Sequence, residues 1–356
     1  MDRRVYLGVC AGFLGGLAGC VGDTDSDEAP EEVTDTSTAT TGSSDGSGST
    51  STPAEETPTE ANEETPTEEP TSTQKVGEAV IGEVVRDDTL AMVVSGMEKR
   101  ESIGDFQEAD SGNTFVVVDL GIKNRTSDEF INFSGFLQTR LKDSEDYTYD
   151  QTIAMTGNTF QGGQIAPGEV SRGDVVYEVP KDASGLTMQF DFEAFALFDF
   201  SRVEIDLSES TGDPTTLNQN LQVEIYGTDD TVEFQDVQVT FNSVETTKEL
   251  GSFAQAEEGN EFVIAVVSTT NNTDEELTIS TALQMVVKDG QGFSYSPSIT
   301  ATSALDQAYS QGSPLASGET RRGKVAYEVP TGTSPLYWVF EFSLWVDGSK
   351  TFWQVR

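Results

Sequence analysis

The chain contains an internal duplication, and this limits the folds that it can adopt. Residues 165–180 read Ile-Ala-Pro-Gly-Glu-Val-Ser-Arg-Gly-Asp-Val-Val-Tyr-Glu-Val-Pro, and residues 315–330 read Leu-Ala-Ser-Gly-Glu-Thr-Arg-Arg-Gly-Lys-Val-Ala-Tyr-Glu-Val-Pro. Upstream, residues 106–124 match residues 253–271 at an offset of 147, against 150 for the first pair. Offsets that differ by only a few residues indicate one domain present twice, with small changes in loop length.

Both copies show the two-residue periodicity of β-strands. Glycine, proline, asparagine and aspartate separate the strands, and no long segment has helical periodicity. Several short strands in each copy predict an all-β fold, with two tandem immunoglobulin-like antiparallel β-sandwiches. The clearest alternating segments are residues 175–179, 186–192, 237–241, 325–329 and 336–342.

The duplication also sets the expected domain boundaries. We place the first immunoglobulin-like domain at residues 76–207 and the second at 221–356, with a polar linker at 208–220. Each domain is expected to fold alone, because the matched strands of one copy have partners in the other. The alternative is a swapped or shared sheet, in which a strand near residues 199–207 completes the other copy.

Several short motifs resemble a known family. Gly112-Asn113-Thr114-Phe115-Val116 begins a strand in the first copy, and Lys142-Asp143 precedes a tyrosine. Ala-x-Gly-Glu-x-x-x-Gly then leads into Tyr-Glu-Val-Pro in both copies. About 270 residues in two copies resemble the immunoglobulin-like domain of unknown function, sometimes called telokin-like, of secreted bacterial and archaeal lipoproteins. The resemblance implies an extracytoplasmic, non-catalytic module without a defined active site.

The N-terminus has the features of an export signal. Arg3-Arg4 precede an apolar segment at 5–18, which is shorter than the roughly 20 residues of a membrane-spanning helix. Arg3-Arg4-Val5-Tyr6-Leu7 resembles a twin-arginine signal, and Leu17-Ala18-Gly19-Cys20 resembles a lipobox. We predict a signal peptide at 1–19 and a lipid on Cys20 that holds the protein on the extracytoplasmic face of the cell membrane. The alternative is an ordinary cleaved signal with an incidental cysteine.

The segment that follows the cysteine is unsuited to folding. Residues 20–75 consist mainly of Thr, Ser, Glu, Asp, Pro and Gly, so too little apolar surface is available to offset the entropy of ordering. We expect a disordered acidic stalk between membrane and domains. Its composition also resembles an O-glycosylated stalk, with a plain flexible linker as the alternative.

The charge indicates the surroundings in which the protein works. Residues 76–356 carry 46 acidic and 17 basic side chains, a net charge of −29, and the whole chain carries −42. Self-repulsion of this size requires screening, and molar salt shortens the Debye length to about 3 Å. The pattern resembles haloarchaeal surface lipoproteins and predicts a halophilic protein. Nucleic acid is excluded as a partner, because phosphate binding needs a basic surface.

Residue types that are absent limit the possible chemistry. The chain has no histidine, and its two cysteines are Cys10 in the leader and Cys20. A Ser-His-Asp triad, a cysteine nucleophile and the usual zinc sites are therefore excluded. The acidic turn at 143–146 lacks the glycine and terminal glutamate of an EF-hand loop, and we interpret it as solvated surface. We expect no catalytic residue, metal or cofactor, and thus no enzyme.

Asparagine and tryptophan residues offer two further candidates. Asn124, Asn132 and Asn271 begin Asn-x-Ser/Thr sequons and are possible N-glycosylation sites of an exported glycoprotein. The paired Asn124 and Asn271 could instead form a turn that favours asparagine. Trp338 aligns with Met188, so we expect the tryptophans of the second copy to fill the core rather than to stack on sugars.

These observations give three hypotheses about function. The first is a lipid-anchored cell-surface protein that acts as a non-catalytic binding or envelope-structural module, with the membrane and an unidentified protein or envelope component as partners. The second is a ligand-capturing partner of a membrane transporter or sensor, which a deep cleft between the copies would favour. The weakest is a carboxylate-based hydrolase, which needs two facing carboxylates in such a cleft.

Overall fold

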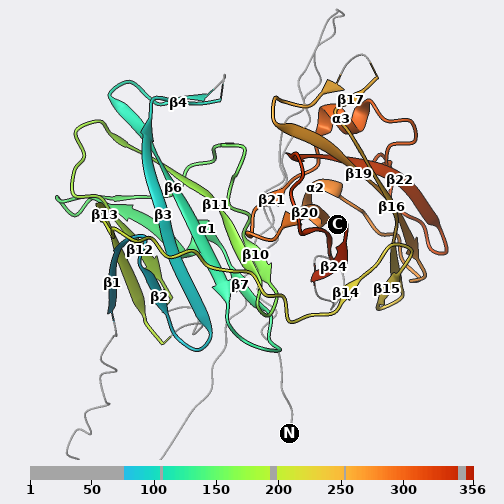
Figure 1. Cartoon of the computed structure of the whole chain (residues 1–356), viewed down its shortest axis with the longest axis horizontal. Helices are drawn as coiled ribbons and strands as arrows, with labels where there is room; N and C mark the ends of the chain where they lie inside the picture. The colour runs from blue at the N-terminus through green and yellow to red at the C-terminus, as the bar shows by residue number, and fades with distance from the viewer. Residues whose placement is uncertain (1–75, 105–106, 193–198, 252–253, 344–349) are drawn as a thin grey trace, which may run out of the picture. The chain divides into compact units, whose positions relative to one another are not determined.

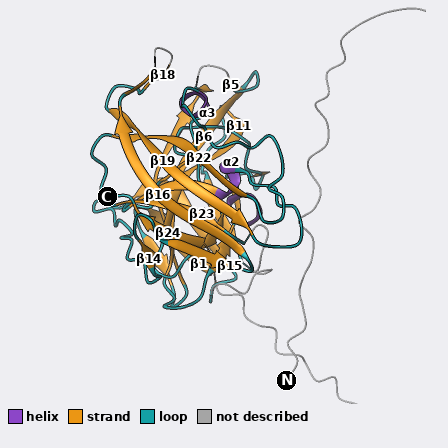
Figure 2. Ribbon diagram, turned by 90° about the vertical axis from the view of Figure 1, so that its right-hand side faces the viewer, coloured by secondary structure: helices purple, strands orange, loops and turns teal. Residues whose placement is uncertain are grey.

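The computed structural model describes residues 76–104, 107–192, 199–251, 254–343 and 350–356. All of them belong to one compact unit, which spans 68–356. Strands make up most of this part of the chain, and its helices are short (Figure 2). The strands form the expected two immunoglobulin-like β-sandwiches, which we call repeat 1 and repeat 2.

Repeat 1 consists of two facing sheets (Figure 1). The first sheet has, in spatial order, β1 (Val76–Ile81), β13 (Arg202–Ser210), β12 (Thr187–Asp191), β8 (Thr139–Lys142) and β9 (Thr148–Tyr149). The second has β11 (Val170–Pro180), β6 (Asn113–Asn124), β3 (Leu90–Arg100) and β2 (Val84–Arg86). Shorter elements complete it: β4 (Ser102–Ile103) with β5 (Gln107–Glu108), β7 (Ile131–Phe133) with β10 (Gly163–Ile165), and α1 (Gly135–Gln138).

Repeat 2 has the same topology. Its first sheet has, in order, β14 (Ile225–Tyr226), β24 (Lys350–Gln354), β23 (Leu336–Glu341), β20 (Met285–Asp289) and β21 (Ser294–Tyr295). Its second has β15 (Thr231–Phe234), β16 (Val237–Thr247), β19 (Asn260–Asn271) and β22 (Thr320–Pro330). The remaining elements are β17 (Glu249–Leu250) with β18 (Ala254–Gln255), α2 (Thr281–Gln284) and α3 (Ile299–Ser303).

Strand pairing confirms the duplication in detail. The ladder of β3 with β6 shifts register between Val94 and Gly96, and that of β16 with β19 shifts between Phe241 and Ser243, at equivalent positions. In each repeat one edge strand pairs in parallel, β1 with β13 and β14 with β24, whereas the other ladders are antiparallel. Every ladder between the described strands joins strands of one repeat, so these strands are not swapped.

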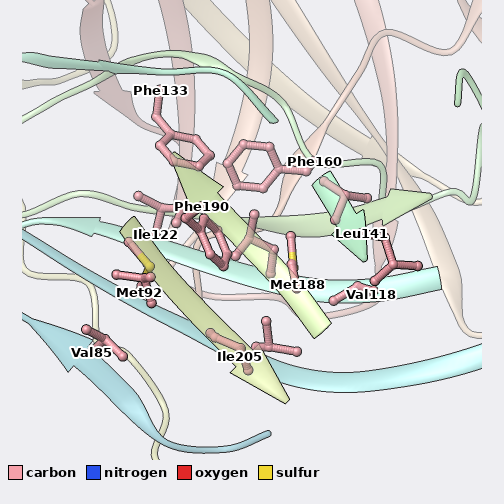
Figure 3. Close-up of a cluster of buried hydrophobic side chains, with 14 of the residues drawn as sticks. Val85, Met92, Val118, Ile122, Phe133, Leu141, Phe160, Met188, Phe190 and Ile205 are labelled. Carbon is pink, nitrogen blue, oxygen red and sulfur yellow. The ribbon is translucent and has the colours of Figure 1, made fainter. Parts of the chain in front are cut away.

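Each sandwich encloses its own apolar core, because alternate side chains of both sheets point inward. In repeat 1 the side chains of Val118, Met188 and Ile205 meet those of Phe133 and Phe160 between the sheets (Figure 3). The strands predicted from alternation all supply core residues: Val175, Tyr177, Val179, Phe190, Val239, Val325 and Phe340 are fully buried.

Two tryptophans fill the core of repeat 2, as expected. Trp338 and Trp353 are fully buried with ring centroids 5.1 Å apart, and Trp338 also stacks on Phe241. The indole N–H of Trp338 donates to the Tyr327 hydroxyl at 3.0 Å, so burial leaves this donor satisfied. Trp345 lies outside the described residues.

Candidate functional site

The residues expected to direct export and anchoring lie outside the described part of the chain. This holds for Arg3, Arg4 and Cys20, for the leader at 1–19 and for the stalk at 20–75. Their roles stay predictions. Among the described residues, no helix has the length and apolar character needed to cross a bilayer.

Asn124 and Asn271 form a turn inside each repeat. Both side chains are fully buried, and each amide nitrogen donates to two backbone carbonyls: Asn124 to Glu129 and Ile165, Asn271 to Glu275 and Leu315. These bonds favour the alternative in which asparagine forms a turn, because each amide nitrogen already uses both of its hydrogen-bond donors inside the fold; glycosylation of Asn124 and Asn271 stays a prediction. Asn132 on β7 is exposed and stays a predicted acceptor.

The acidic turn after β8 is also explained by backbone geometry. Asp143 accepts hydrogen bonds from the backbone N–H groups of Glu145 and Tyr147 and from the Tyr149 hydroxyl. Asp289 accepts the equivalent three bonds in repeat 2. The described residues contain no group of three potential metal ligands. The carboxylate of Asp143 therefore serves the turn.

The two repeats meet at a buried interface, which we call the seam. Ala166 of repeat 1 and Val339 and Phe352 of repeat 2 are all fully buried there. Partly buried apolar side chains of both repeats pack around these three residues: Phe130, Leu221, Val223, Val286 and Tyr337. The outer face of the β20–β23–β24 sheet is thus covered by the end of repeat 1, so that this sheet is buried on both faces.

The linker predicted at 208–220 is part of this interface rather than a free polar segment. β13 continues to Ser210, and Leu217 packs with Ala91, Val93 and Val170 at 7% exposure. The N–H groups of Asn220 and Gln222 donate to the carbonyls of Gly168 and Pro167. Gly168 has a φ of 74°, and an added Cβ would lie 2.0 Å from the Asn220 oxygen. Only glycine fits this contact.

A buried cluster of charges lies at the centre of the seam. Oε1 of Glu169 is 2.7 Å from the Nζ atoms of both Lys288 and Lys350, whereas Oε2 accepts a hydrogen bond from the Ala166 N–H. Lys350 also donates to the Gln164 carbonyl at 2.9 Å. The side chains of Glu169 and Lys288 are 0% and 1% exposed. One carboxylate from repeat 1 therefore pairs with two ammonium groups from repeat 2.

The pKa values of the cluster follow from burial and charge. Burial alone would raise the pKa of Glu169, but Lys288 and Lys350 outweigh it and hold this pKa below the ordinary value. Burial lowers the pKa of Lys288 to about 8, against the attraction of Glu169 and with the repulsion of Lys350. Glu169 and Lys288 are therefore both charged at neutral pH, and removing Glu169 would leave two buried ammonium groups without a counter-charge.

A second contact extends the seam along β11. The guanidinium of Arg172 lies 5.6 Å from the ring centroid of Phe293, and the Arg172 N–H donates to the Gly292 carbonyl at 3.0 Å. This is the geometry of a cation–π interaction. Backbone and side chain of one residue thus both bind the β20–β21 turn of repeat 2.

A cavity of about 330 Å³ opens beside the cluster. Asn132 and Gln164 line it from repeat 1, and Val339, Glu341 and Lys350 line it from repeat 2. Burial raises the pKa of Glu341, although Lys350 and Ser343 lower it in part. Apolar residues such as Val339 and polar residues such as Gln164 both line the cavity, and small-molecule sites combine the two in the same way.

An acidic pair lies on the outer face of the other sheet of repeat 1. Asp119 on β6 is directly opposite Asp174 on β11. Burial raises the pKa of both carboxyls; Asp174 raises that of Asp119 further, whereas Arg172 lowers it. Because burial and a like charge both disfavour ionisation, the folded protein is destabilised when these groups lose their protons.

Asp119→Asn is therefore expected to stabilise the protein at pH 7 by roughly 0.2–1 kcal/mol. A carboxyl whose folded pKa is raised lowers the free energy of unfolding as pH rises through the acid range, so the gain should vanish below about pH 4. Urea unfolding at pH 7 and pH 4 measures it. Asp88→Asn, at an exposed position, changes the net charge equally and is the control. An equal effect of both variants would contradict the pair's role.

Comparison with known proteins places the repeats in a family. Residues 79–197 and 226–350 match the family described as "Domain of unknown function (DUF4352)", once per repeat. The chain belongs to this family. No curated protein is significantly similar to the chain in sequence.

Solved structures that are similar to part of the chain include the following three proteins. A Bacillus subtilis protein described as a candidate lipoprotein (ycdA) is 13% identical, with 36% of this chain and 39% of that chain covered and a TM-score of 0.30. An uncharacterised β-sandwich protein of Clostridium difficile is 16% identical, with 39% and 99% covered and a TM-score of 0.28. The secreted protein MPT63 of Mycobacterium tuberculosis is 12% identical, with 36% and 95% covered and a TM-score of 0.28.

Sequence reasoning missed the seam. Glu169 belongs to the repeated Ala-x-Gly-Glu motif and Lys288 matches Lys142, so repetition alone does not distinguish them from ordinary turn positions, and no sequence motif includes Lys350. One signal could have shown the seam: the second copy has Val286, Val339 and Phe352 where the first has Arg140, Gln189 and Glu204. A strand that is apolar on both faces is typical of a sheet covered on both sides.

Proposed function

We propose that this DUF4352 protein is a lipid-anchored surface protein whose two repeats act together as a non-catalytic binding or envelope-structural module. The seam is the observation that supports the proposal most. It joins the repeats through apolar contacts and a buried charge cluster, so a partner would meet one composite surface. The polar residues singled out in the sequence form turns, as Asn124 and Asp143 do.

Ligand capture for a transporter or sensor is the second candidate. The seam cavity supports it, because the cavity lies between the copies and combines apolar and polar walls. A hydrolase has less support, since Glu341 is the only carboxylate among the described residues that line this cavity and a glycosidase needs two. Native mass spectrometry of the protein from its own membranes would detect a retained ligand.

Cys20→Ser is expected to release the protein into the medium or to leave it unprocessed. The reason is that the described chain has no helix able to span a bilayer, so lipid on Cys20 would be the attachment. Fractionation in high salt measures it, and Cys10→Ser in the leader is the matched control. A processed Cys20→Ser variant that still sediments with membranes would contradict the anchor.

Replacing Arg3 and Arg4 with lysine should block export, and unchanged export would contradict the twin-arginine route.

A further inference from the structure

Both surfaces that form the seam have counterparts that the seam does not use. Repeat 1 contributes its Ala-x-Gly-Glu turn, and the equivalent turn of repeat 2, residues 315–319, carries the half-exposed Glu319. Repeat 2 contributes the outer face of β20–β23–β24, and the equivalent face of repeat 1 is β8–β12–β13. The seam therefore leaves two surfaces uncovered: the turn of repeat 2 and the outer sheet face of repeat 1.

The open surfaces keep the charges of the seam cluster. Glu319 is equivalent to Glu169 and caps its own turn in the same way, by accepting from the Ala316 N–H at 2.9 Å. Lys142 is equivalent to Lys288, and Arg202, opposite Asp191, is equivalent to Lys350, opposite Glu341. In place of a partner across the seam, Lys142 pairs with Asp146 at the surface, and such an exposed pair is weak. The half-exposed Glu319 pairs with Arg321, whose side chain is 9% exposed and also donates to the Ser313 and Pro314 carbonyls.

The cation–π contact of the seam has an open counterpart as well. Arg322 on β22 is equivalent to Arg172 and is exposed. Tyr147 is equivalent to Phe293 and is 63% exposed, which is unusual for a large aromatic side chain. Repeat 2 therefore exposes a guanidinium and repeat 1 exposes an aromatic ring, at the positions equivalent to Arg172 and Phe293 of the seam.

Charge complementarity between the two surfaces is confined to the counterparts of the seam cluster. The face of repeat 1 presents Arg140, Lys142 and Arg202 together with Asp191, Glu204 and Asp206, so both signs are mixed on it. Glu204 and Asp206 also accept hydrogen bonds from Gln189 and Ser208, neighbours on the same sheet. The turn of repeat 2 lies beside an acidic loop, because Leu277 and Leu315 bond to each other directly after Asp274, Glu275 and Glu276.

We propose that the open turn of repeat 2 binds the open face of repeat 1 in a second copy of the same chain. The contact is heterologous, so it continues from one molecule to the next as a head-to-tail row. It is weaker than the seam, because Arg140, Gln189 and Glu204 replace the apolar residues of the covered face. The row rests on the proposed function in one respect: the membrane anchor would favour it by raising the effective concentration of the chains. The contact itself does not need the anchor.

Disulfide trapping tests this contact in cells that make the full chain. Ala316 and Gln189 are the counterparts of Ala166 and Val339, which pack in one cluster at the seam. A chain with both Ala316→Cys and Gln189→Cys should give a ladder of covalent multimers under mild oxidation. Chains with either cysteine alone should give at most a dimer. No product beyond the single-cysteine controls would overturn the proposal.

Charge variants in the double-cysteine background separate specific contact from collision. Lys142→Glu places a like charge opposite Glu319 and should reduce the ladder at least tenfold. Glu319→Gln keeps the turn cap and removes the charge, so it should reduce the ladder as well; ladders unchanged in both variants would also overturn the proposal. Membrane fractionation of the same cells reports the anchor separately. A ladder from protein that is released from the membrane would contradict the anchor but not the contact. Anchored protein that gives no ladder would contradict the contact but not the anchor.

Discussion

Replacing Glu169 with alanine should lower the free energy of unfolding of the full chain by about 3–5 kcal/mol. The substitution leaves the ammonium groups of Lys288 and Lys350 buried together without their counter-charge, and it removes the bond to the Ala166 N–H. Chemical unfolding in concentrated salt measures the loss, since a buried pair is screened far less than surface charges.

Glu319→Ala is the matched control, because it removes the same turn cap at an exposed position. It should cost only about 0.5–1.5 kcal/mol for the hydrogen bond and at most about 1 kcal/mol more for the pair with Arg321, which keeps its bonds to the Ser313 and Pro314 carbonyls. Equal losses in the two variants would contradict the role of the cluster. The pKa of Glu169 is held below its ordinary value, so its contribution is present above about pH 4 and is lost as pH falls through the folded pKa. The Glu169→Ala variant should lack this acid-dependent loss.

Separating the repeats should destabilise repeat 2 by about 3–6 kcal/mol. Residues 221–356 alone expose Val339 and Phe352, which are fully buried at the seam, and burial of each such side chain contributes about 1.5–3 kcal/mol. The sequence predicted that each half folds alone, and the seam changes this expectation for the second half. Calorimetry of the isolated half and of the full chain in the same salt makes the comparison. An unchanged melting temperature for repeat 2 would show that the seam contributes nothing to it.

The architecture could be predicted because its signals are local. Alternating apolar residues determine which face of a strand is buried, and the repeated segments carry the same alternation twice. The equivalent register shifts near Gly96 and Ser243 follow from this duplication. The parallel edge pairs were not foreseen, since β14 is two residues long and its partner is distant in the chain.

The seam could not be predicted with the same ease, because it depends on differences between the copies. Similarity between repeats identifies shared cores, but an interface between repeats needs different surfaces on each. Glu169 and Glu319 end the same Ala-x-Gly-Glu motif, yet one is fully buried and the other half-exposed. The pairing of β20, β23 and β24 shows that Val286, Val339 and Phe352 lie on one face of their sheet. The turn that carries Glu169 covers this face.

The close approach at Gly168 has a consequence for the two copies of the Ala-x-Gly-Glu turn. Gly168 touches Asn220, whereas Gly318 has the same backbone conformation, with φ of 73°, and open space where a Cβ would lie. Asparagine or aspartate can occupy such a conformation at modest cost when nothing is in the way. The glycine of the first turn is therefore closed to replacement, whereas that of the second can be replaced by asparagine or aspartate. Two loops that began as identical copies now tolerate different mutations.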